Sequence, residues 1–313
     1  MPEARELHVD SILSNFSVQY RNEEMLWRIV CPLVKVNKRS DKYFKYAKDN
    51  AYRQYDDKIG PKSHANEIDW AVSQDNYSVK GHALADWIPQ EELDNADNPL
   101  SPERDSNDFL NGALDGVQES RVAALLTTNA NFPTANKVTL SGTSQWGQSA
   151  DDPIGSILTA IESCFQRANT LVFGIDTWNI FRKLPEVLDA VKAATRMQSS
   201  GGGLATQSEV AARFDVDQVL VGRGRLVTSK EGQTSAYGRI WGKHCVALYV
   251  PPGEMGPRTI AFAKTFAESD RVTMRDFDSK RGEKGAHYIK VSWNSDEKLV
   301  ATDVGYLIEN AVP

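Results

Sequence analysis

The clearest pattern of apolar and polar positions lies in the middle third of the chain. Residues 154–165 carry apolar side chains at helical spacing after Asp152 and Pro153, which predicts a helix with an aspartate N-cap. The apolar run NTLVFGI (169–175) predicts a buried strand, and Asp176 is expected to cap the helix that follows it. The same reading predicts further buried strands at 217–222, 245–252 and 260–266 and a short helix at 208–214. This order of elements is typical of an α/β domain.

A second group of elements flanks this third on both sides. Ser101, Pro102 and the acids after them predict the start of a long helix, whose apolar stripe continues for about seven turns. Gly112 and Gly116 predict a bend or a close packing contact in that helix. A short strand is predicted at 138–140, and alternating segments at 288–293 and 299–307 around a turn at 294–297 predict a C-terminal hairpin. A second, discontinuous domain is therefore expected.

The N-terminal part of the chain has a different character. Residues 1–21 form a polar arm with a few apolar positions, and 25–36 predict a helix end followed by a strand broken at Pro32. Residues 42–70 hold four tyrosines, a phenylalanine and a tryptophan, but neither the helical nor the strand period persists. Residues 68–79 predict a returning strand. We therefore expect an aromatic arm that packs on a surface other than its own.

Charge sharpens this expectation. Residues 35–62 hold nine Lys or Arg against four Asp, while 86–108 hold eight acids against one Arg. Oppositely charged segments in one chain can join neighbouring copies or neutralise each other within one subunit, and charge alone favours neither. The candidate basic and aromatic contacts are Lys38, Arg39, Lys42, Tyr43, Lys45, Tyr46, Tyr52, Arg53 and Tyr55, and the candidate acidic partners are Asp86, Glu91, Glu92, Asp94 and Asp97.

The whole chain of 313 residues has a net charge of −6, which argues against a sequence-specific reader of nucleic acid. Its N-terminus is not a secretory signal, and its apolar runs are too short to span a bilayer. Together with the three widely spaced cysteines at 31, 164 and 245, these features favour a reducing cytoplasm and no membrane.

Candidate catalytic chemistry is weak. Cys31, Cys164 and Cys245 are far apart, so neither a disulfide framework nor a cysteine zinc site is indicated. The five histidines lack metal-ligand spacing, and no nucleophile elbow is present. We therefore predict no catalytic residue, no metal and no cofactor. One alternative remains, an α/β enzyme that binds a nucleotide around 170–221, although the glycines there have the wrong spacing.

Six stretches in order carry a family resemblance: KVNKRSDKYFKYAKDNAYR, LADWIP…NADNPLSPERDS, RANTLVFGIDTWNIFRKLPEVLDAVK, VDQVLVGRGRLVTSKEG, IWGKHCVALYVPP and KLVATDVGYLIENAV. Together they resemble the major capsid proteins of tailed bacteriophages and prophages, over roughly residues 30–312. The resemblance implies the α+β Hong-Kong-ninety-seven-like capsid fold, which encapsulins share.

The resemblance also implies a division of the chain. Residues 1–29 would be an N-terminal arm, and 30–80 a strand and the extended E-loop (residues 43–79). Residues 81–151 plus 268–313 would form a peripheral domain with a spine helix near 102–127 and a β-hairpin. Residues 152–267 would form the axial domain.

The function implied is that of a major capsid protein. Copies would assemble as pentamers and hexamers into the icosahedral head of the virion, around double-stranded DNA that is enclosed without sequence preference. Assembly would occur in the host cytoplasm, and scaffold, portal and cement proteins are further candidate partners. An encapsulin-type compartment around a protein cargo is the main alternative.

Overall fold

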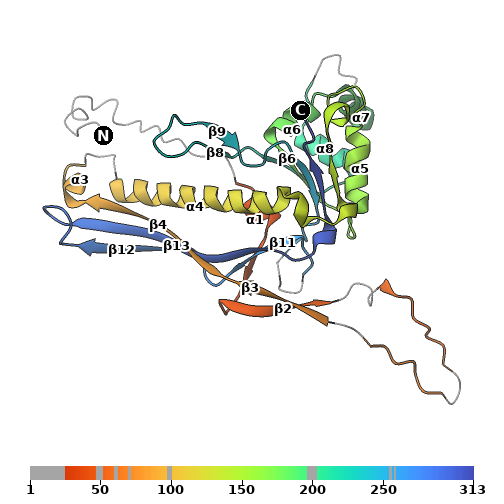
Figure 1. The fold of residues 1–313 in the computed structure, drawn as a ribbon, viewed down its shortest axis with the longest axis horizontal. Coiled ribbons are helices and arrows are strands. Elements are labelled where there is room, and N and C mark those ends of the chain that lie inside the picture. Colours follow the sequence, from red (N-terminus) through yellow and green to blue (C-terminus); the bar gives the residue numbers. More distant parts are fainter. Residues whose placement is uncertain are drawn as a thin grey trace.

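The computed structural model describes residues 25–46, 52–59, 63–69, 72–96, 101–195, 203–253, 256 and 259–313. The molecule is elongated, and the spine helix α4 (Pro102–Thr127) lies along its length (Figure 1). A twisted sheet lies along one side of α4, an α/β body lies at one end, and the E-loop extends from that end.

The twisted sheet consists of β1 (Leu33–Lys35), β11 (Ala263–Ala267), β13 (Ala286–Leu299), β12 (Val272–Asp278) and β4 (Lys80–Pro89). The long strand β13 is its centre, because it pairs antiparallel with β4, β12 and β11. Leu110 and Leu114 of α4 pack on this sheet, against Ile88, Ile289 and Val291. This apolar stripe explains why the helix lies along the sheet.

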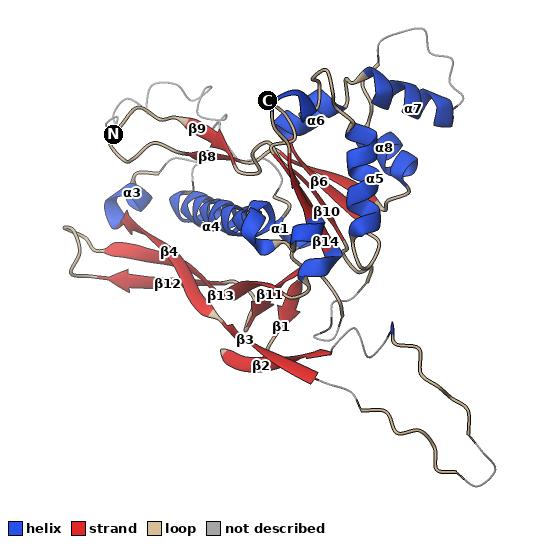
Figure 2. Cartoon of the chain, turned by 45° about the vertical axis from the view of Figure 1, so that its right-hand side comes forward, coloured by secondary structure: helices blue, strands red, loops and turns tan. Residues whose placement is uncertain are grey.

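The α/β body contains a sheet of order β5 (Lys137–Thr139), β14 (Gly305–Glu309), β10 (Cys245–Leu248), β6 (Thr170–Gly174) and β7 (Gln218–Gly222). Helices α5 (Pro153–Ser163), α6 (Ile175–Phe181), α7 (Pro185–Thr195) and α8 (Gln207–Phe214) gather around this sheet (Figure 2). Every residue of β6 is buried. Phe173 of β6 lies within an aromatic cluster with Trp146, Trp178 and Phe181, which forms the centre of the body.

Shorter elements complete the described chain. They are α1 (Trp27–Val30), β2 (Ser40–Tyr46), β3 (Val72–Ser78), α3 (Gln90–Asp94), β8 (Arg225–Val227), β9 (Tyr237–Arg239) and 3-10 helices at Asn129–Asn131, Thr134–Asn136, Gly142–Ser144 and Thr302–Val304. The strands β2 and β3 pair antiparallel at the base of the E-loop, and β8 and β9 form a separate hairpin.

Most of the predicted elements are confirmed. The long helix begins at Pro102, and the Asp152 carboxylate accepts a hydrogen bond from Gly155 N–H at 2.8 Å at the start of α5. The predicted strands in the middle third correspond to β6, β7 and β10, and the returning strand of the E-loop corresponds to β3. The broken pattern at Pro32 corresponds to α1 followed by β1.

The predicted C-terminal hairpin is wrong. The polar stretch at 294–297 is not a turn but the continuation of β13, in which 294–295 pair with β4 and 295–297 pair with β11. Its polar side chains have partners within the fold, since Glu297 accepts hydrogen bonds from Arg121 and Gln118. The hairpin of this sheet is instead formed by β12 and β13.

Two smaller expectations also need correction. Asp176 lies in the first turn of α6 and does not cap it, because Gly174 occupies the N-cap. The helix α4 continues through Gly112 and Gly116, and a Cβ built at either glycine meets no atom of the described residues within 4 Å, so the alternative of a close packing contact is not supported in that part of the chain. Strands from both predicted domain ranges share sheets, since β5 and β14 lie in the sheet of the α/β body and β11 pairs with β13. The division of the chain into domains stays a prediction.

Candidate assembly surfaces

The root of the E-loop, which the paired strands β2 and β3 form, is anchored on its own chain. Tyr77 stacks on Phe266 with ring centroids 4.9 Å apart, and Tyr43 packs on the same ring at 5.5 Å. The Tyr43 hydroxyl donates to Asp75 at 2.9 Å, and burial together with this carboxylate raises the pKa of Tyr43. Tyr43, predicted as a contact to a neighbour, is therefore part of the root.

Two further contacts fasten the root to β13, and the sequence reasoning missed them. Lys298 reaches the Asp75 carboxylate at 3.3 Å and the Asn76 carbonyl, and Ser78 N–H donates to Asp296 at 2.8 Å. These partners lie more than 200 positions apart in the sequence, so no local pattern could have paired them.

Beyond its root, the described part of the E-loop is exposed to solvent. All described residues at 52–59 and 63–69 are exposed, including the large apolar side chains of Ile59 (59%) and Ile68 (55%). Tyr52 is 74% exposed, although its ring meets Phe165 edge-on at 4.9 Å. Arg53 and Tyr55 are exposed as well. Such exposure of apolar groups on an extended segment is typical of a surface that a partner covers.

The basic candidates differ in their surroundings. Lys38 pairs with Asp41 at 3.1 Å, and Arg39 pairs with Glu268 at 2.9 Å, so both have partners within the chain. The Lys42 side chain is exposed, and its backbone N–H is the main cause of the lowered pKa of Asp41, followed by Lys38. Lys45 and Tyr46 lie in β2, but their side chains are outside the described residues.

The acidic candidates lie at the other end of the molecule. Glu91 and Glu92 are exposed on α3, and Asp94 pairs with Lys284 at 3.3 Å. Hydrogen bonds from Gln90 and Lys284 lower the pKa of Asp94. Asp86 is exposed to solvent, and its carboxylate accepts a hydrogen bond from Ser106 Oγ at 2.7 Å. Asp97 is outside the described residues.

Figure 1 places α3 and the E-loop at opposite ends of the long axis. The described ion pairs of Lys38, Arg39 and Asp94 go to residues outside the opposite segment. In the described part of the chain, the basic and acidic segments therefore do not neutralise each other within one subunit.

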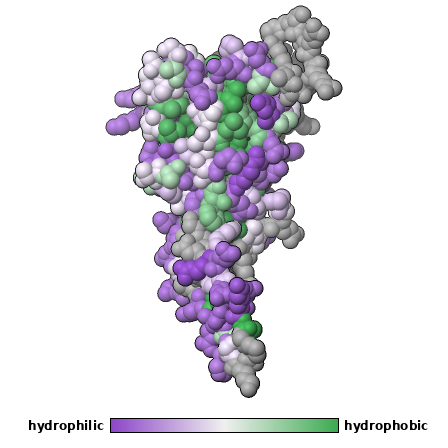
Figure 3. Space-filling model, turned by 90° about the vertical axis from the view of Figure 1, so that its right-hand side faces the viewer, coloured by the Kyte–Doolittle hydropathy of each residue, from purple (hydrophilic) through white to green (hydrophobic). Residues whose placement is uncertain are grey.

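The α/β body adds apolar surface next to the E-loop. Leu158 of α5 and Phe165, which lies just after the helix ends at Ser163, are about half exposed, although the sequence predicted both on the apolar face of one helix. In Figure 3 apolar surface gathers on the body, and the part of the molecule below it is mostly hydrophilic. The apolar stripe of α5 therefore extends beyond the side of the helix that is buried in the core.

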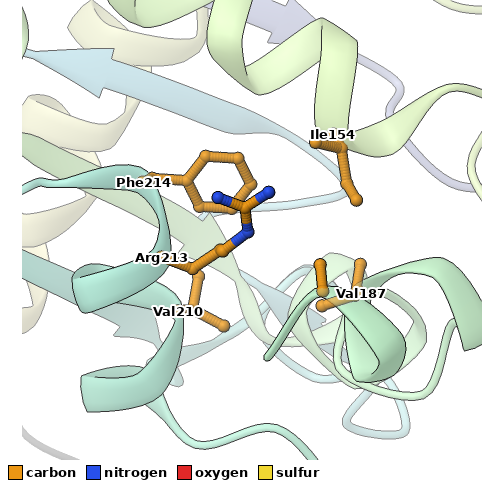
Figure 4. Close-up of a pocket in the computed structure, with 6 residues that line it drawn as sticks. Ile154, Val187, Val210, Arg213 and Phe214 are labelled. Atoms are coloured by element: carbon orange, nitrogen blue, oxygen red, sulfur yellow. The ribbon is translucent and has the colours of Figure 1, made fainter. Parts of the chain in front are cut away.

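A surface depression lies between α5, α7 and α8 of this body (Figure 4). Its empty volume is about 190 Å³, and it is lined by Ile154, Val187, Ala190, Val210, Arg213 and Phe214. Sites for nucleotide-sized ligands usually enclose about 300–1,000 Å³. This depression gives no support to the nucleotide-binding alternative.

Other reactive groups are buried or structural. All three cysteines are buried and unpaired, and burial raises the pKa of Cys31 and of Cys164 to about 12. His244 accepts a hydrogen bond from Asn310 N–H at 3.3 Å, and burial lowers its pKa. Within the described ranges, His, Cys, Asp and Glu side chains form no group suited to a metal ion. No helix in those ranges is long and apolar enough to cross a membrane.

Two curated proteins match the chain over nearly its whole length. The major capsid protein of Pseudomonas phage JBD67 is 28% identical over 304 residues, which cover 97% of each protein. The major capsid protein of Burkholderia phage BcepMu is 24% identical over 306 residues, covering 96% of this chain and 95% of the relative. The chain is a homologue of phage major capsid proteins. No family profile matches it.

Solved structures agree on the fold. A phage-related protein of Bordetella bronchiseptica RB50 has a TM-score of 0.72 at 21% identity, and the match covers 93% of each chain. The capsid of cyanophage P-SCSP1u has a TM-score of 0.65 at 8% identity, covering 97% of this chain and 93% of the other. An encapsulin of Synechococcus elongatus reaches 0.53 at 10% identity, with 95% and 93% covered. This capsid homologue has the Hong-Kong-ninety-seven-like fold.

Proposed function

We infer that this chain is a capsid shell protein whose copies associate with one another to build the shell of a virion. Two relatives that are named major capsid proteins match the chain over nearly the whole length of both proteins. The observation that carries the inference within the chain is the E-loop beyond its root, whose exposed apolar and aromatic residues have no core of their own. A segment of this kind becomes energetically reasonable when a neighbouring copy covers it.

The finer proposal is that the shell is built from pentamers and hexamers, in which each E-loop contacts the next copy. The root, held by Tyr43, Tyr77 and Phe266, would fix the direction of the loop, and exposed Lys42 and Arg53 would face acidic residues of the neighbour. Exposed Glu91 and Glu92 on α3 are the proposed acidic partners. Repeated head-to-tail contacts of this kind close into rings.

We further propose that the shell encloses double-stranded DNA. The net charge of −6 suits a container, because a protein that makes few phosphate contacts retains little DNA affinity at cellular salt. Scaffold, portal and cement proteins remain proposed partners. An encapsulin-type compartment is the second candidate, favoured only by the shared fold.

Electron microscopy and light scattering of the purified full chain test the proposal, first alone and then coexpressed with its neighbouring genes. Shells, tubes or rings of five and six copies are expected, and nucleic acid should be protected from nuclease inside shells made in a complete phage. A protein cargo in place of nucleic acid would favour the compartment. A monomer or dimer under every condition would contradict the capsid function.

A further inference from the structure

One histidine lies where four elements meet, at the end of the molecule that carries α3. His287 of β13 is beside Gln90 of α3, Glu103 in the first turn of α4 and Arg275 of β12. Its side chain is only 14% exposed. Figure 1 shows α3, the start of α4 and the β12–β13 hairpin together at this end. The imidazole therefore has a neighbour on each of the three elements that surround it.

The hydrogen bonds around the imidazole select one neutral tautomer. The Gln90 amide nitrogen donates to Asp94 at 2.8 Å, so the Gln90 oxygen faces the ring and accepts from His287 Nε2 at 2.9 Å. On the other side of the ring, Arg275 Nε and Nη2 lie 3.3 and 3.2 Å from Nδ1, and a guanidinium can only donate. The proton of the neutral ring is therefore on Nε2, and Nδ1 is an acceptor.

Glu103 places an acceptor next to Nδ1. Its Oε1 is buried and lies 2.5 Å from Arg275 Nη2 and 3.7 Å from His287 Nδ1. Within the described residues, no donor meets this oxygen at a hydrogen-bonding angle. A proton on Nδ1 would supply an aligned donor after a movement of about 1 Å. The carboxylate can therefore take either of two cationic partners.

The other charges near the ring leave this choice open. Asp94 of α3 is paired with Lys284 of the β12–β13 hairpin at 3.3 Å, so these two charges neutralise each other. Phe277, directly opposite the histidine in β12, packs against the ring with centroids 5.0 Å apart and carries no charge. Protonation of the ring is therefore governed by Glu103, which favours it, and Arg275, which opposes it.

We propose that protonation of His287 exchanges the partner of Glu103 and thereby releases the outer end of β12. With a neutral ring, Arg275 ties β12 to Glu103 and to Nδ1. A protonated Nδ1 no longer accepts from Arg275 and repels it, and donates to Glu103 instead, so that β13 holds the start of α4. Histidine ordinarily titrates between about pH 5 and pH 8, so mild acid drives the exchange. It takes place within one chain and does not depend on the proposed function.

Only one end of β12 is affected. In the described strand order of its sheet β12 comes last and pairs with β13. Its other end stays tied to α4, because Arg271 pairs with Asp115 at 2.6 Å and Thr273 donates to Asn107 at 3.0 Å. The Arg275 side chain is already 57% exposed, so it can turn to solvent without losing a buried site. The exchange therefore loosens residues 275–278 and leaves the rest of the strand in place.

Nitrogen NMR of the full, unassembled chain, labelled in histidine and arginine, tests the exchange. At about pH 8, His287 should show a protonated Nε2 and a bare Nδ1. Between about pH 8 and pH 5.5, the signals of His287 and of Arg275 Nε should shift with one midpoint, while the exposed His64 titrates without moving Arg275. A protonated Nδ1 at pH 8, or an Arg275 signal that does not follow His287, would overturn the proposal.

Two variants separate the exchange from ordinary titration. Glu103→Gln removes the carboxylate and should lower the midpoint of His287 by about 0.5 pH unit or more, whereas Arg275→Gln removes the opposing charge and should raise it by a similar amount. Arg104→Gln changes an exposed charge in the same turn of α4 and is the matched control, with a shift below about 0.2 unit. Shifts of the same sign for the first two variants, or none larger than the control, would contradict the proposal. The wild-type titration decides alone if a variant does not fold.

Amide hydrogen exchange tests the release of β12. After correction for the intrinsic effect of pH, residues 275–278 should exchange at least about threefold faster at pH 5.5 than at pH 7.5, measured relative to residues 271–273. His287→Gln takes up no proton and should abolish this difference, while His64→Gln should preserve it. A difference that persists in His287→Gln, or none in the wild type, would refute the release.

Discussion

The sheet of the α/β body buries its large apolar side chains within the chain, whereas the E-loop exposes them. In the body, β6 is buried at every position, and Phe173 touches three other aromatic rings. In the E-loop, the described residues 52–59 and 63–69 are exposed at every position. Both segments contain large apolar side chains, so composition does not separate them. The difference is whether the partner surface lies in the same chain, and the predictions below test this contrast.

The largest effect on folding is expected in the body. Phe173→Ala removes a fully buried ring and should lower the free energy of unfolding by about 3–5 kcal/mol. Ile59→Ala in the E-loop is the matched control, and it should change that free energy by less than about 0.5 kcal/mol because Ile59 is already exposed. Denaturant unfolding of the unassembled chain measures both. Similar losses for the two variants would refute the contrast.

The next effect is expected at Glu119, which joins α4 to the start of the described chain. Glu119→Ala leaves two backbone N–H groups and the Trp241 indole without their acceptor, and should cost about 3 kcal/mol. Burial raises the pKa of this carboxyl, although the three donors oppose the rise. Glu119→Gln keeps one oxygen acceptor and should cost less than the alanine variant. Thermal melting that ranked glutamine below alanine would contradict this account.

A smaller, pH-dependent effect is expected where β14 meets β5. Hydrogen bonds from Thr139 at 2.6 Å and Asn129 at 2.8 Å hold the pKa of Glu309 below its ordinary value. A carboxyl with a lowered pKa stabilises the fold at neutral pH and loses that contribution as the pH falls through the lowered value. Between about pH 7 and pH 3 the wild type should lose up to about 1 kcal/mol more than Glu309→Gln. Equal losses in unfolding experiments would exclude this role.

The smallest effect on folding is expected from charge reversal in the E-loop. Lys42→Glu with Arg53→Glu should change the free energy of unfolding by less than about 0.5 kcal/mol, because both side chains are exposed. Assembly, followed by light scattering, should nevertheless fall strongly, since the variant places like charges against the neighbour. Lys230→Glu with Lys280→Glu makes the same charge change away from the loop and is the control. If stability fell as much as assembly, the intersubunit role would be excluded.

Sequence reasoning succeeded where a local signal marked an element. Pro102 and Asp152 located the starts of α4 and α5, and continuous apolar runs located β6 and β7. It failed where the meaning of a pattern depended on distant strands. The polar residues at 294–297 suggested a turn, yet they belong to β13 because Arg121 and Gln118 satisfy Glu297 from α4.

The candidate contact residues show the same difference between local sequence signals and long-range contacts. The sequence alone determined that residues 42–70 carry aromatics without a self-packing period and that the two segments are oppositely charged. Only the tertiary structure decided that Tyr43, Lys38 and Arg39 have partners within the chain, whereas Lys42, Tyr52 and Arg53 are exposed. The physical reason is range: period and capping act over a few residues, whereas Phe266 and Glu268 meet the E-loop root only after more than 180 residues of chain have folded back.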